Sequence, residues 1–281
     1  MAAYAHPEVL VETDWVKQNL GKPGVKIVEI DVDTKAYDAG HIKEAIGFNW
    51  QTQLQDQVNR DIIGKEAFEK LMGAAGISPH DTVVLYGDNN NWFAAYGFWL
   101  FKLYGHKDVR LMNGGRVKWL NESDKELTTE RPSNTTVTYK VTEVHNELRA
   151  LVPEVSQVSK SRSGSLVDVR SPDEFTGKVI APPGMTETAQ RGGHIPGAKS
   201  VPWSTAVNQN GTFKSADELR KIYLEQAGVD PNKGTIAYCR IGERSSHTWF
   251  VLTYLLGLKN VKNYDGSWTE YGNLIGFPIE K

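Results

Sequence analysis

A single cysteine stands where nucleophilic chemistry would be expected. Cys239 is the only cysteine among the 281 residues, so an internal disulfide is excluded and no cysteine cluster exists to hold structural zinc. The residues that follow it are, in order, Arg240, Ile241, Gly242, Glu243 and Arg244. Nearby guanidinium groups favour a thiolate over a thiol, so we expect the pKa of Cys239 to lie below its ordinary value of about 8.5. The thiolate is the nucleophilic form of cysteine, and this segment therefore predicts covalent chemistry on sulfur.

The elements predicted around Cys239 place it where α/β proteins bind their ligands. The short apolar run Thr235–Tyr238 predicts a buried parallel strand, and Ser245–Leu256 predicts a helix that Gly257 ends. Cys239 is then the first residue after a strand, at the carboxyl edge of a sheet, where ligands of such folds gather. Inward-pointing amides of the turn and the positive end of the helix predict a cradle for an anion.

The two halves of the chain repeat one pattern. Gly40-His41-Ile42 matches Gly193-His194-Ile195 at an offset of 153, and Val84-Leu85-Tyr86 matches Ile236-Ala237-Tyr238 at an offset of 152. Near the start of each half the offset is 139, which predicts a fourteen-residue insertion between Arg170 and His194. Several anchors in register indicate a duplicated unit.

We predict an α/β protein of two tandem domains, each a parallel sheet flanked by helices. The first domain is expected to span residues 1–122, a linker residues 123–152, and the second domain residues 153–281. The residue of the first domain that matches Cys239 is Gly87, and no arginine follows it closely. We therefore expect the chemistry to lie in the second domain alone.

Other conspicuous residues are predicted to be structural. His41 and His194 recur in both halves, including the half without a cysteine, so we expect them to bond loop to backbone. His247, in the helix after the cysteine, is expected to be packed or solvated. The segment Ser215–Ala227 opens with the capping-box spacing of Ser215 and Glu218 and predicts a helix.

Taken together, these features resemble the tandem rhodaneses, with most likeness to bacterial thiosulfate sulfurtransferases. The duplicated unit, the GHI-x-x-A pattern, the segment Asp265-Gly266-Ser267-Trp268 and the loop after Cys239 carry the resemblance, which extends from about Val16 to Tyr271. It implies that Cys239 takes a sulfane sulfur from thiosulfate as a persulfide, releases sulfite, and passes the sulfur to cyanide or to a small or protein thiol. No cofactor or metal is implied.

The resemblance also implies roles for the neighbours of Cys239. Arg244 would contact the substrate, Arg240 would add charge at the wall of the cleft, and amides around Ile241, Gly242 and Glu243 would hold the sulfur. Two guanidinium groups and a helix end suit thiosulfate, a small dianion, and would stabilise departing sulfite. Certain animal relatives have basic residues at the positions of Ile241 and Glu174. We therefore expect thiosulfate binding in this chain to depend more on Arg244.

Three alternatives stay open. A mercaptopyruvate sulfurtransferase performs the same chemistry on a monoanionic donor, but such relatives usually have a glycine after the cysteine and a neutral loop. A cysteine-dependent phosphatase places an arginine six positions after the cysteine, whereas Arg244 is five positions after Cys239. A non-enzymatic sulfur-carrier module is disfavoured. The loop of the first domain lacks a nucleophile because Gly87 stands there, whereas the loop of the second domain keeps Cys239.

Composition excludes several other classes of protein. Lys and Arg total 32 and Asp and Glu total 34, giving a net charge of −2, which does not favour a nucleic-acid or acidic-membrane binder. No apolar run approaches the ~20 residues of a transmembrane helix, and the acidic residues among the first twenty do not fit a signal peptide. We therefore expect a cytoplasmic protein with no membrane or nucleic-acid partner.

Overall fold

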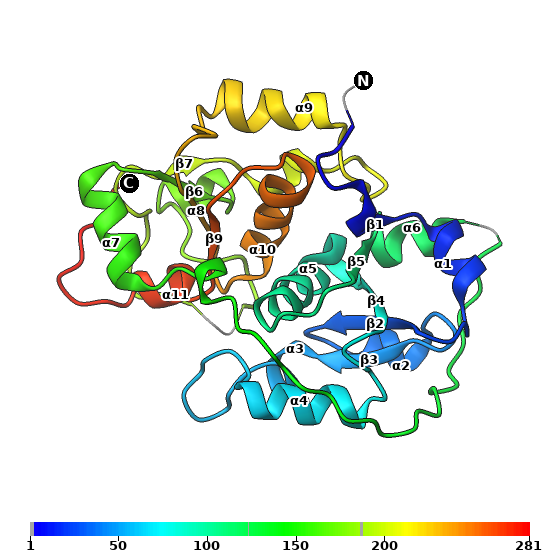
Figure 1. Cartoon of the computed structure of the whole chain (residues 1–281). Coiled ribbons are helices and arrows are strands. Elements are labelled where there is room, and N and C mark those ends of the chain that lie inside the picture. Colours follow the sequence, from blue (N-terminus) through cyan, green and yellow to red (C-terminus); the bar gives the residue numbers. More distant parts are fainter. Residues whose placement is uncertain (1–2, 123, 186–187) are drawn as a thin grey trace. The chain divides into compact units, whose positions relative to one another are not determined.

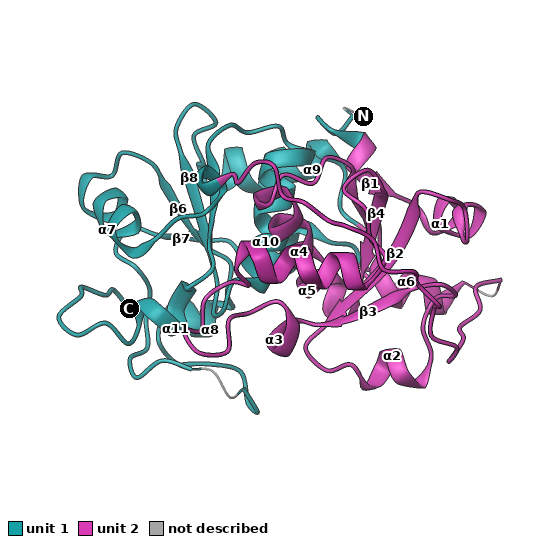
Figure 2. Ribbon diagram, turned by 60° about the horizontal axis from the view of Figure 1, so that its bottom comes forward, with its two compact units in different colours: residues 1–7, 146–208, 213–281 teal, residues 8–145, 209–212 magenta. Residues whose placement is uncertain are grey.

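The computed structural model describes residues 3–122, 124–185 and 188–281 and divides the chain into two compact units (Figure 2). Unit 2 comprises residues 8–145 and 209–212, and unit 1 comprises residues 1–7, 146–208 and 213–281. Each unit contains one parallel sheet with helices packed on it (Figure 1). The α/β fold predicted from the sequence is confirmed.

Unit 2 is built on a five-stranded sheet in the order β1-β5-β4-β2-β3, in which every pairing is parallel. Its strands are β1 Leu10–Val11, β2 Val25–Asp31, β3 Ile46–Asn49, β4 Thr82–Tyr86 and β5 Val109–Met112. Its helices are α1 Thr13–Asn19, α2 Lys35–Ala39, α3 Trp50–Gln53, α4 Lys65–Ala74, α5 Asp88–Leu103 and α6 Gly115–Asn121. Helix α5 packs across β2, β4 and β5, and most residues of these strands are buried, including the charged Glu29 and Asp31 of β2.

Unit 1 is built on a four-stranded parallel sheet in the order β7-β6-β8-β9. Its strands are β6 Ser165–Asp168, β7 Lys199–Ser200, β8 Thr235–Tyr238 and β9 Val261–Tyr264. Its helices are α7 Val152–Ser161, α8 Pro172–Phe175, α9 Ala216–Arg220, α10 Glu243–Phe250 and α11 Ser267–Tyr271. Helices α9 and α10 continue as the π-helical turns Lys221–Gln226 and Val251–Leu255. Short helical turns at Pro7–Val9, Asn146–Leu148 and Trp203–Ala206 complete the chain.

Most of these elements match the sequence predictions. Strand β8 has the predicted bounds, and Ser215 caps α9 through the predicted capping box with Glu218. Helix α10 begins at Glu243, two residues earlier than predicted, because the loop before it is closed by Gly242, whose φ of 101° lies in the left-handed region.

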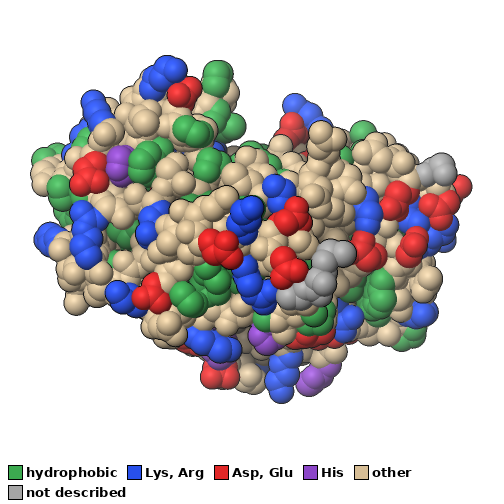
Figure 3. Space-filling model, turned by 90° about the horizontal axis from the view of Figure 1, so that it is seen from above, with side chains coloured by type: hydrophobic (Ala, Val, Ile, Leu, Met, Phe, Trp, Pro, Cys, Tyr) green, Lys and Arg blue, Asp and Glu red, His purple; other side chains and the backbone are tan. Residues whose placement is uncertain are grey.

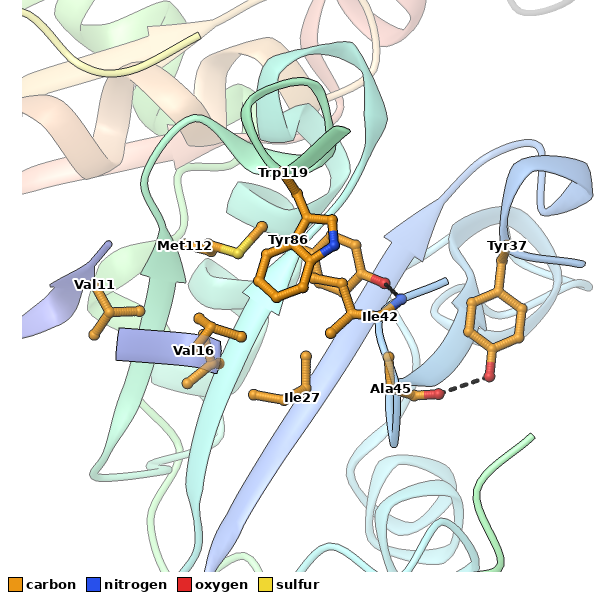
Figure 4. Packing of buried hydrophobic residues seen from close by; sticks show 10 residues of the cluster. Val11, Val16, Ile27, Tyr37, Ile42, Ala45, Tyr86, Met112 and Trp119 are labelled. Atoms are coloured by element: carbon orange, nitrogen blue, oxygen red, sulfur yellow. Dashed lines mark hydrogen bonds between the residues drawn. The ribbon is translucent and has the colours of Figure 1, made fainter. Parts of the chain in front are cut away.

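The apolar side chains of each sheet form a core that also holds a recurring tyrosine. In unit 2 the core gathers Val11, Val16, Ile27, Tyr37, Ile42, Ala45, Val84, Tyr86, Met112 and Trp119 (Figure 4). The hydroxyl of Tyr86 accepts a hydrogen bond from the amide of Ile42 at 3.0 Å, and in unit 1 the hydroxyl of Tyr238 accepts one from Ile195 at 3.1 Å. The same tyrosine ties the GHI segment to the sheet in both units, which supports the predicted duplication.

The segment predicted as a linker, residues 123–152, is divided between the units. Residues 124–145 belong to unit 2, where Thr128 pairs with His41 through backbone hydrogen bonds and Tyr139 is buried. Residues 146–152 belong to unit 1. The polar composition of the segment indicated an interdomain linker, but Val137 also donates to the Gly73 carbonyl of unit 2, and the amide of Ala150 donates to the Asn263 carbonyl of unit 1.

The inserted segment between Arg170 and His194 is anchored at its end. The guanidinium of Arg191 donates to the carbonyl oxygens of Tyr271, Gly272, Leu274 and Phe277 at 2.7 to 3.3 Å. Residues 186–187 of the insertion lie outside the described residues. Where the structure describes the chain, no helix is both long and apolar enough to cross a membrane. On the face seen in Figure 3, side chains of both charges are interspersed.

Candidate active site

Cys239 lies at the carboxyl end of β8, immediately before the loop that leads into α10. The loop is held by hydrogen bonds from α11, in which the amide of Trp268 donates to the Cys239 carbonyl and that of Thr269 to the Arg240 carbonyl, both at 3.0 Å. The amide of Cys239 donates to the Ser267 hydroxyl at 3.0 Å. All three contacts come from α11, so the position of the sulfur is set by the fold of unit 1.

Gly242 is the turning point of the loop. Its carbonyl accepts hydrogen bonds from the hydroxyls of Ser245 and Ser246 at 3.1 and 2.7 Å. A Cβ atom at this position would lie 2.9 Å from the Cα of Asp265, so both the positive φ and the lack of space require glycine. With this geometry the amide of Gly242 points back and donates to the Sγ of Cys239 at 3.2 Å.

The sulfur of Cys239 is buried among polar groups. Its side chain has no exposed surface, and besides Gly242 its neighbours are the Glu243 Oε2 at 3.4 Å and the Ser267 hydroxyl at 4.0 Å. Inert cysteines of a core are surrounded by apolar atoms, whereas this one has a hydrogen-bond donor on one side and a proton acceptor on the other.

The expected lowering of the Cys239 pKa is wrong. Burial of the thiol raises its pKa, and the carboxylate of Glu243 raises it further. Arg244 and hydrogen bonding by Ser245 act in the opposite direction without reversing the result. The sequence shows the two arginines, but it does not show that the Glu243 side chain turns toward the sulfur or how completely water is excluded.

Arg244 is buried in an ion pair with Glu174. Its Nη1 and Nη2 donate to the two carboxylate oxygens of Glu174 at 3.0 and 3.1 Å, and both side chains are almost fully buried. Burial raises and this ion pair lowers the pKa of Glu174, and the net effect is a lowering. Glu174 is oriented by the capping box of α8, in which it also accepts hydrogen bonds from the amide and hydroxyl of Ser171 at 3.0 Å. The charge of Arg244 is therefore already largely balanced.

The other predicted site residues are also in the loop. Arg240 and Ile241 are buried, at 7% and 3% exposure, and the backbone of Arg240 is bound by α11 as described above. Glu243 differs from the prediction, which concerned its amide, because its carboxylate reaches both the cysteine and the Nε of Arg244, the latter at 3.5 Å.

The corresponding loop of unit 2 has no room for a cysteine. A Cβ atom at Gly87 would lie 2.5 Å from the Ile30 carbonyl oxygen and 2.9 Å from an oxygen of Asp31. Beyond it, Asn89, Asn90 and Asn91 all have positive φ, with values of 51°, 55° and 64°. The side chain of Asn91 closes this loop by accepting from the Gly87 amide at 3.0 Å.

The histidines have the structural roles predicted for them. His41 stacks on Tyr37 and His194 on Phe175, with ring centroids 3.8 and 3.6 Å apart, and each Nδ1 is 2.8 Å from the carbonyl oxygen of that same aromatic residue. His247 is buried against Phe213, with ring centroids 4.8 Å apart.

The described residues contain no metal-binding cluster, and a cavity in unit 1 lies away from Cys239. In the described ranges, no group of three or more His, Cys, Asp or Glu side chains could hold a metal ion. A cavity of about 550 Å³ in unit 1 is lined by Thr235 and Val261, the first residues of β8 and β9. It therefore lies at the edge of the sheet opposite to Cys239.

Three residues of this site had no predicted role in it. Glu174 and Ser267 reach the loop from other elements, and Asn263, at β9, accepts a hydrogen bond from Ser245 at 2.7 Å. The S-x-x-E spacing of Ser171 and Glu174 was a readable signal for a capping box, but nothing in it indicates the partner Arg244.

Comparison with known proteins shows the family of this chain. The family model of the rhodanese-like domain matches residues 12–122 and 146–274. A protein of Saccharopolyspora erythraea, provisionally named a thiosulfate sulfurtransferase, is 59% identical over 97% of this chain and 96% of its own length. The sulfur carrier protein TtuD of Thermus thermophilus is 55% identical over 99% of this chain and 98% of its own. The crystal structure of SseA from Escherichia coli, described among the 3-mercaptopyruvate sulfotransferases, superposes with a TM-score of 0.78 and 25% identity over 92% of this chain and 98% of that one. The chain therefore belongs to the rhodanese family of sulfurtransferases, and it carries two rhodanese-like domains.

Proposed function

We propose that the protein is a thiosulfate sulfurtransferase whose nucleophile is Cys239. The sulfur of Cys239 attacks the sulfane sulfur of thiosulfate, a persulfide forms, and sulfite leaves. Cyanide or a thiol then attacks the outer sulfur and regenerates the enzyme. The transfer is a double displacement that needs one cysteine and no cofactor.

One observation carries the proposal, namely the Gly242 amide that donates to the Cys239 sulfur at 3.2 Å in the turn before α10. A persulfide keeps its negative charge on sulfur, and amide donors at a helix N-terminus stabilise an anion in that position. The names of the similar proteins from Saccharopolyspora erythraea and Thermus thermophilus also support a role in sulfur transfer.

A second candidate donor is favoured by the charges around the sulfur. Arg244 is paired with Glu174, and the carboxylate of Glu243 lies 3.4 Å from the thiol, so the loop is less cationic than its sequence suggests. A smaller positive charge at the loop weakens the binding of a dianion more than the binding of a monoanionic donor such as 3-mercaptopyruvate. The similarity to SseA supports this alternative.

The test compares both donors with cyanide as acceptor, using the unmodified chain and the variant Cys239→Ser. We expect turnover with thiosulfate that Cys239→Ser abolishes while the far-ultraviolet circular dichroism is unchanged. A higher kcat/KM with 3-mercaptopyruvate would favour the second candidate. Thiosulfate turnover that survives in Cys239→Ser would refute the assignment of the nucleophile.

A further inference from the structure

The position of the Glu243 side chain raises a question about the thiol proton. Cys239 has no exposed surface, and its Sγ–H is directed to the Glu243 Oε2 at 3.4 Å. Sulfur must lose this proton before it can attack a donor, and no bulk water touches it. The carboxylate is the proton acceptor within reach.

We propose that the carboxylate of Glu243 takes the proton of Cys239 during persulfide formation and returns it when the sulfur is passed on. The proposal rests on the proposed function and assigns the proton transfer within it.

The orientation of Glu243 is fixed by a chain of contacts in unit 1. Its Oε1 is 3.5 Å from the Nε of Arg244, whose other two nitrogens are held by Glu174. Glu174 is held in turn by Ser171 at the start of α8. Three charged side chains thus contact one another in succession, and the one that faces the sulfur is a carboxylate. A positioned carboxylate of this kind is a candidate general base.

The charges around Cys239 determine where its proton rests before a donor binds. The thiol is favoured in the resting state, since burial and the carboxylate of Glu243 both raise the pKa of Cys239. The charged groups that face the pair are Arg244 and, through it, Glu174, and these two are paired with each other.

The steps balance as follows. The Sγ–H bond breaks and an O–H bond forms on Glu243, leaving its electron pair on the sulfur. That pair forms a bond to the sulfane sulfur, and the sulfur–sulfur bond of thiosulfate breaks as sulfite leaves with its electrons. In the second displacement cyanide takes the outer sulfur as thiocyanate, Sγ leaves with the bonding pair, and the proton returns to it from Glu243.

The test measures loading of Cys239 in a single turnover with thiosulfate, by rapid quenching and intact mass, between pH 5 and 9. The variants are Glu243→Gln, Glu243→Asp and the control Glu225→Gln, an exposed carboxylate of the same unit. We expect Glu225→Gln to match the unmodified chain and Glu243→Gln to load about 100-fold more slowly at pH 7, the lower end of the general-base range. Its rate should rise tenfold for each pH unit below the pKa of its thiol, because only pre-formed thiolate reacts.

A second measurement separates proton transfer from a simple effect of charge. Thiolate absorbance at ~240 nm follows the ionisation of the single cysteine. Removing the charge of Glu243 should shift this titration to lower pH, so the loading rates of Glu243→Gln and of the unmodified chain are compared at equal fractions of thiolate, where the variant should still load more slowly. Loading of Glu243→Gln at or above the unmodified rate in that comparison would overturn the proposal. Should that variant fail to fold, Glu243→Asp must keep a rate that is flat with pH near neutrality, and a tenfold rise for each pH unit in it would also refute the proposal.

Failure of the proposed function would look different. In that case the unmodified chain takes no sulfur from thiosulfate, whereas the shift of the thiolate titration between the unmodified chain and Glu243→Gln still reports the contact of the two side chains.

Discussion

Glu174 and Arg244 are 70 residues apart in the sequence and form a two-pronged ion pair directly behind the loop of Cys239. Buried ion pairs of this kind add little net stability, but loss of one partner leaves a buried charge without compensation. The pair orients Arg244, and under the proposed function it would also reduce the positive charge that a donor meets. It thereby links the architecture of α8 to the chemistry at the end of β8.

The first prediction concerns this pair. Glu174→Gln should lower the free energy of unfolding by about 3 kcal/mol, because Arg244 loses its counter-charge in a buried site. The matched control is Glu154→Gln, which removes a partly exposed partner of Lys262 and should cost less than about 1 kcal/mol. Urea denaturation measures both. Equal losses in the two variants would contradict a special role of the buried pair.

The same variant should change donor preference. With Glu174 neutral, Arg244 presents more positive charge, so the ratio of kcat/KM for thiosulfate to that for 3-mercaptopyruvate should rise. An unchanged or lower ratio would show that the pair does not control the charge that donors meet.

The second prediction concerns Asp31 in unit 2. Burial is the largest cause that raises the pKa of Asp31, to about 9, and the neighbouring Glu29 adds to it. This folded value lies above the unfolded value of 3.8. The contribution of Asp31 to the free energy of unfolding is therefore fully present below about pH 4 and is lost as the pH rises toward 9. Asp31→Asn keeps an oxygen for the Asp88 amide and removes the ionisation, so its melting temperature should exceed that of the unmodified chain increasingly from pH 5 to 9. Parallel curves for the two proteins would contradict the buried, protonated carboxyl.

The third prediction concerns acid stability and His247. Burial lowers the pKa of His247 from 6.5 to about 3, so its contribution to stability is present above pH 6.5 and is lost as the pH falls toward 3. His247→Phe keeps an aromatic ring against Phe213 and removes the titration. The fall in melting temperature between pH 6.5 and 4 should therefore be smaller in this variant. A fall of the same size would place the acid sensitivity elsewhere.

The sequence allowed the local features of the site to be predicted. The strand before Cys239, the turn and the helix after it depend on neighbouring residues, and so does the capping box at Ser215. The duplication was readable because the GHI segments and the strands that end at Tyr86 and Tyr238 recur in register, and in the structure both tyrosines make the same hydrogen bond.

The electrostatics of the site could not be predicted, because they depend on contacts between distant segments. The two arginines suggested an ionised cysteine, yet Glu174 reaches Arg244 from α8, and Glu243 turns its carboxylate toward the sulfur. The depth of burial, which has the largest effect on the pKa of Cys239, is a property of the packed unit and not of the loop sequence.

The most direct test of the central claim is the intact mass of the chain after incubation with thiosulfate. We predict a gain of one sulfur atom, mapped to Cys239 by peptide mass, that disappears when cyanide is added. An unchanged mass, or the same gain in Cys239→Ser, would contradict the claim that this cysteine carries the transferred sulfur.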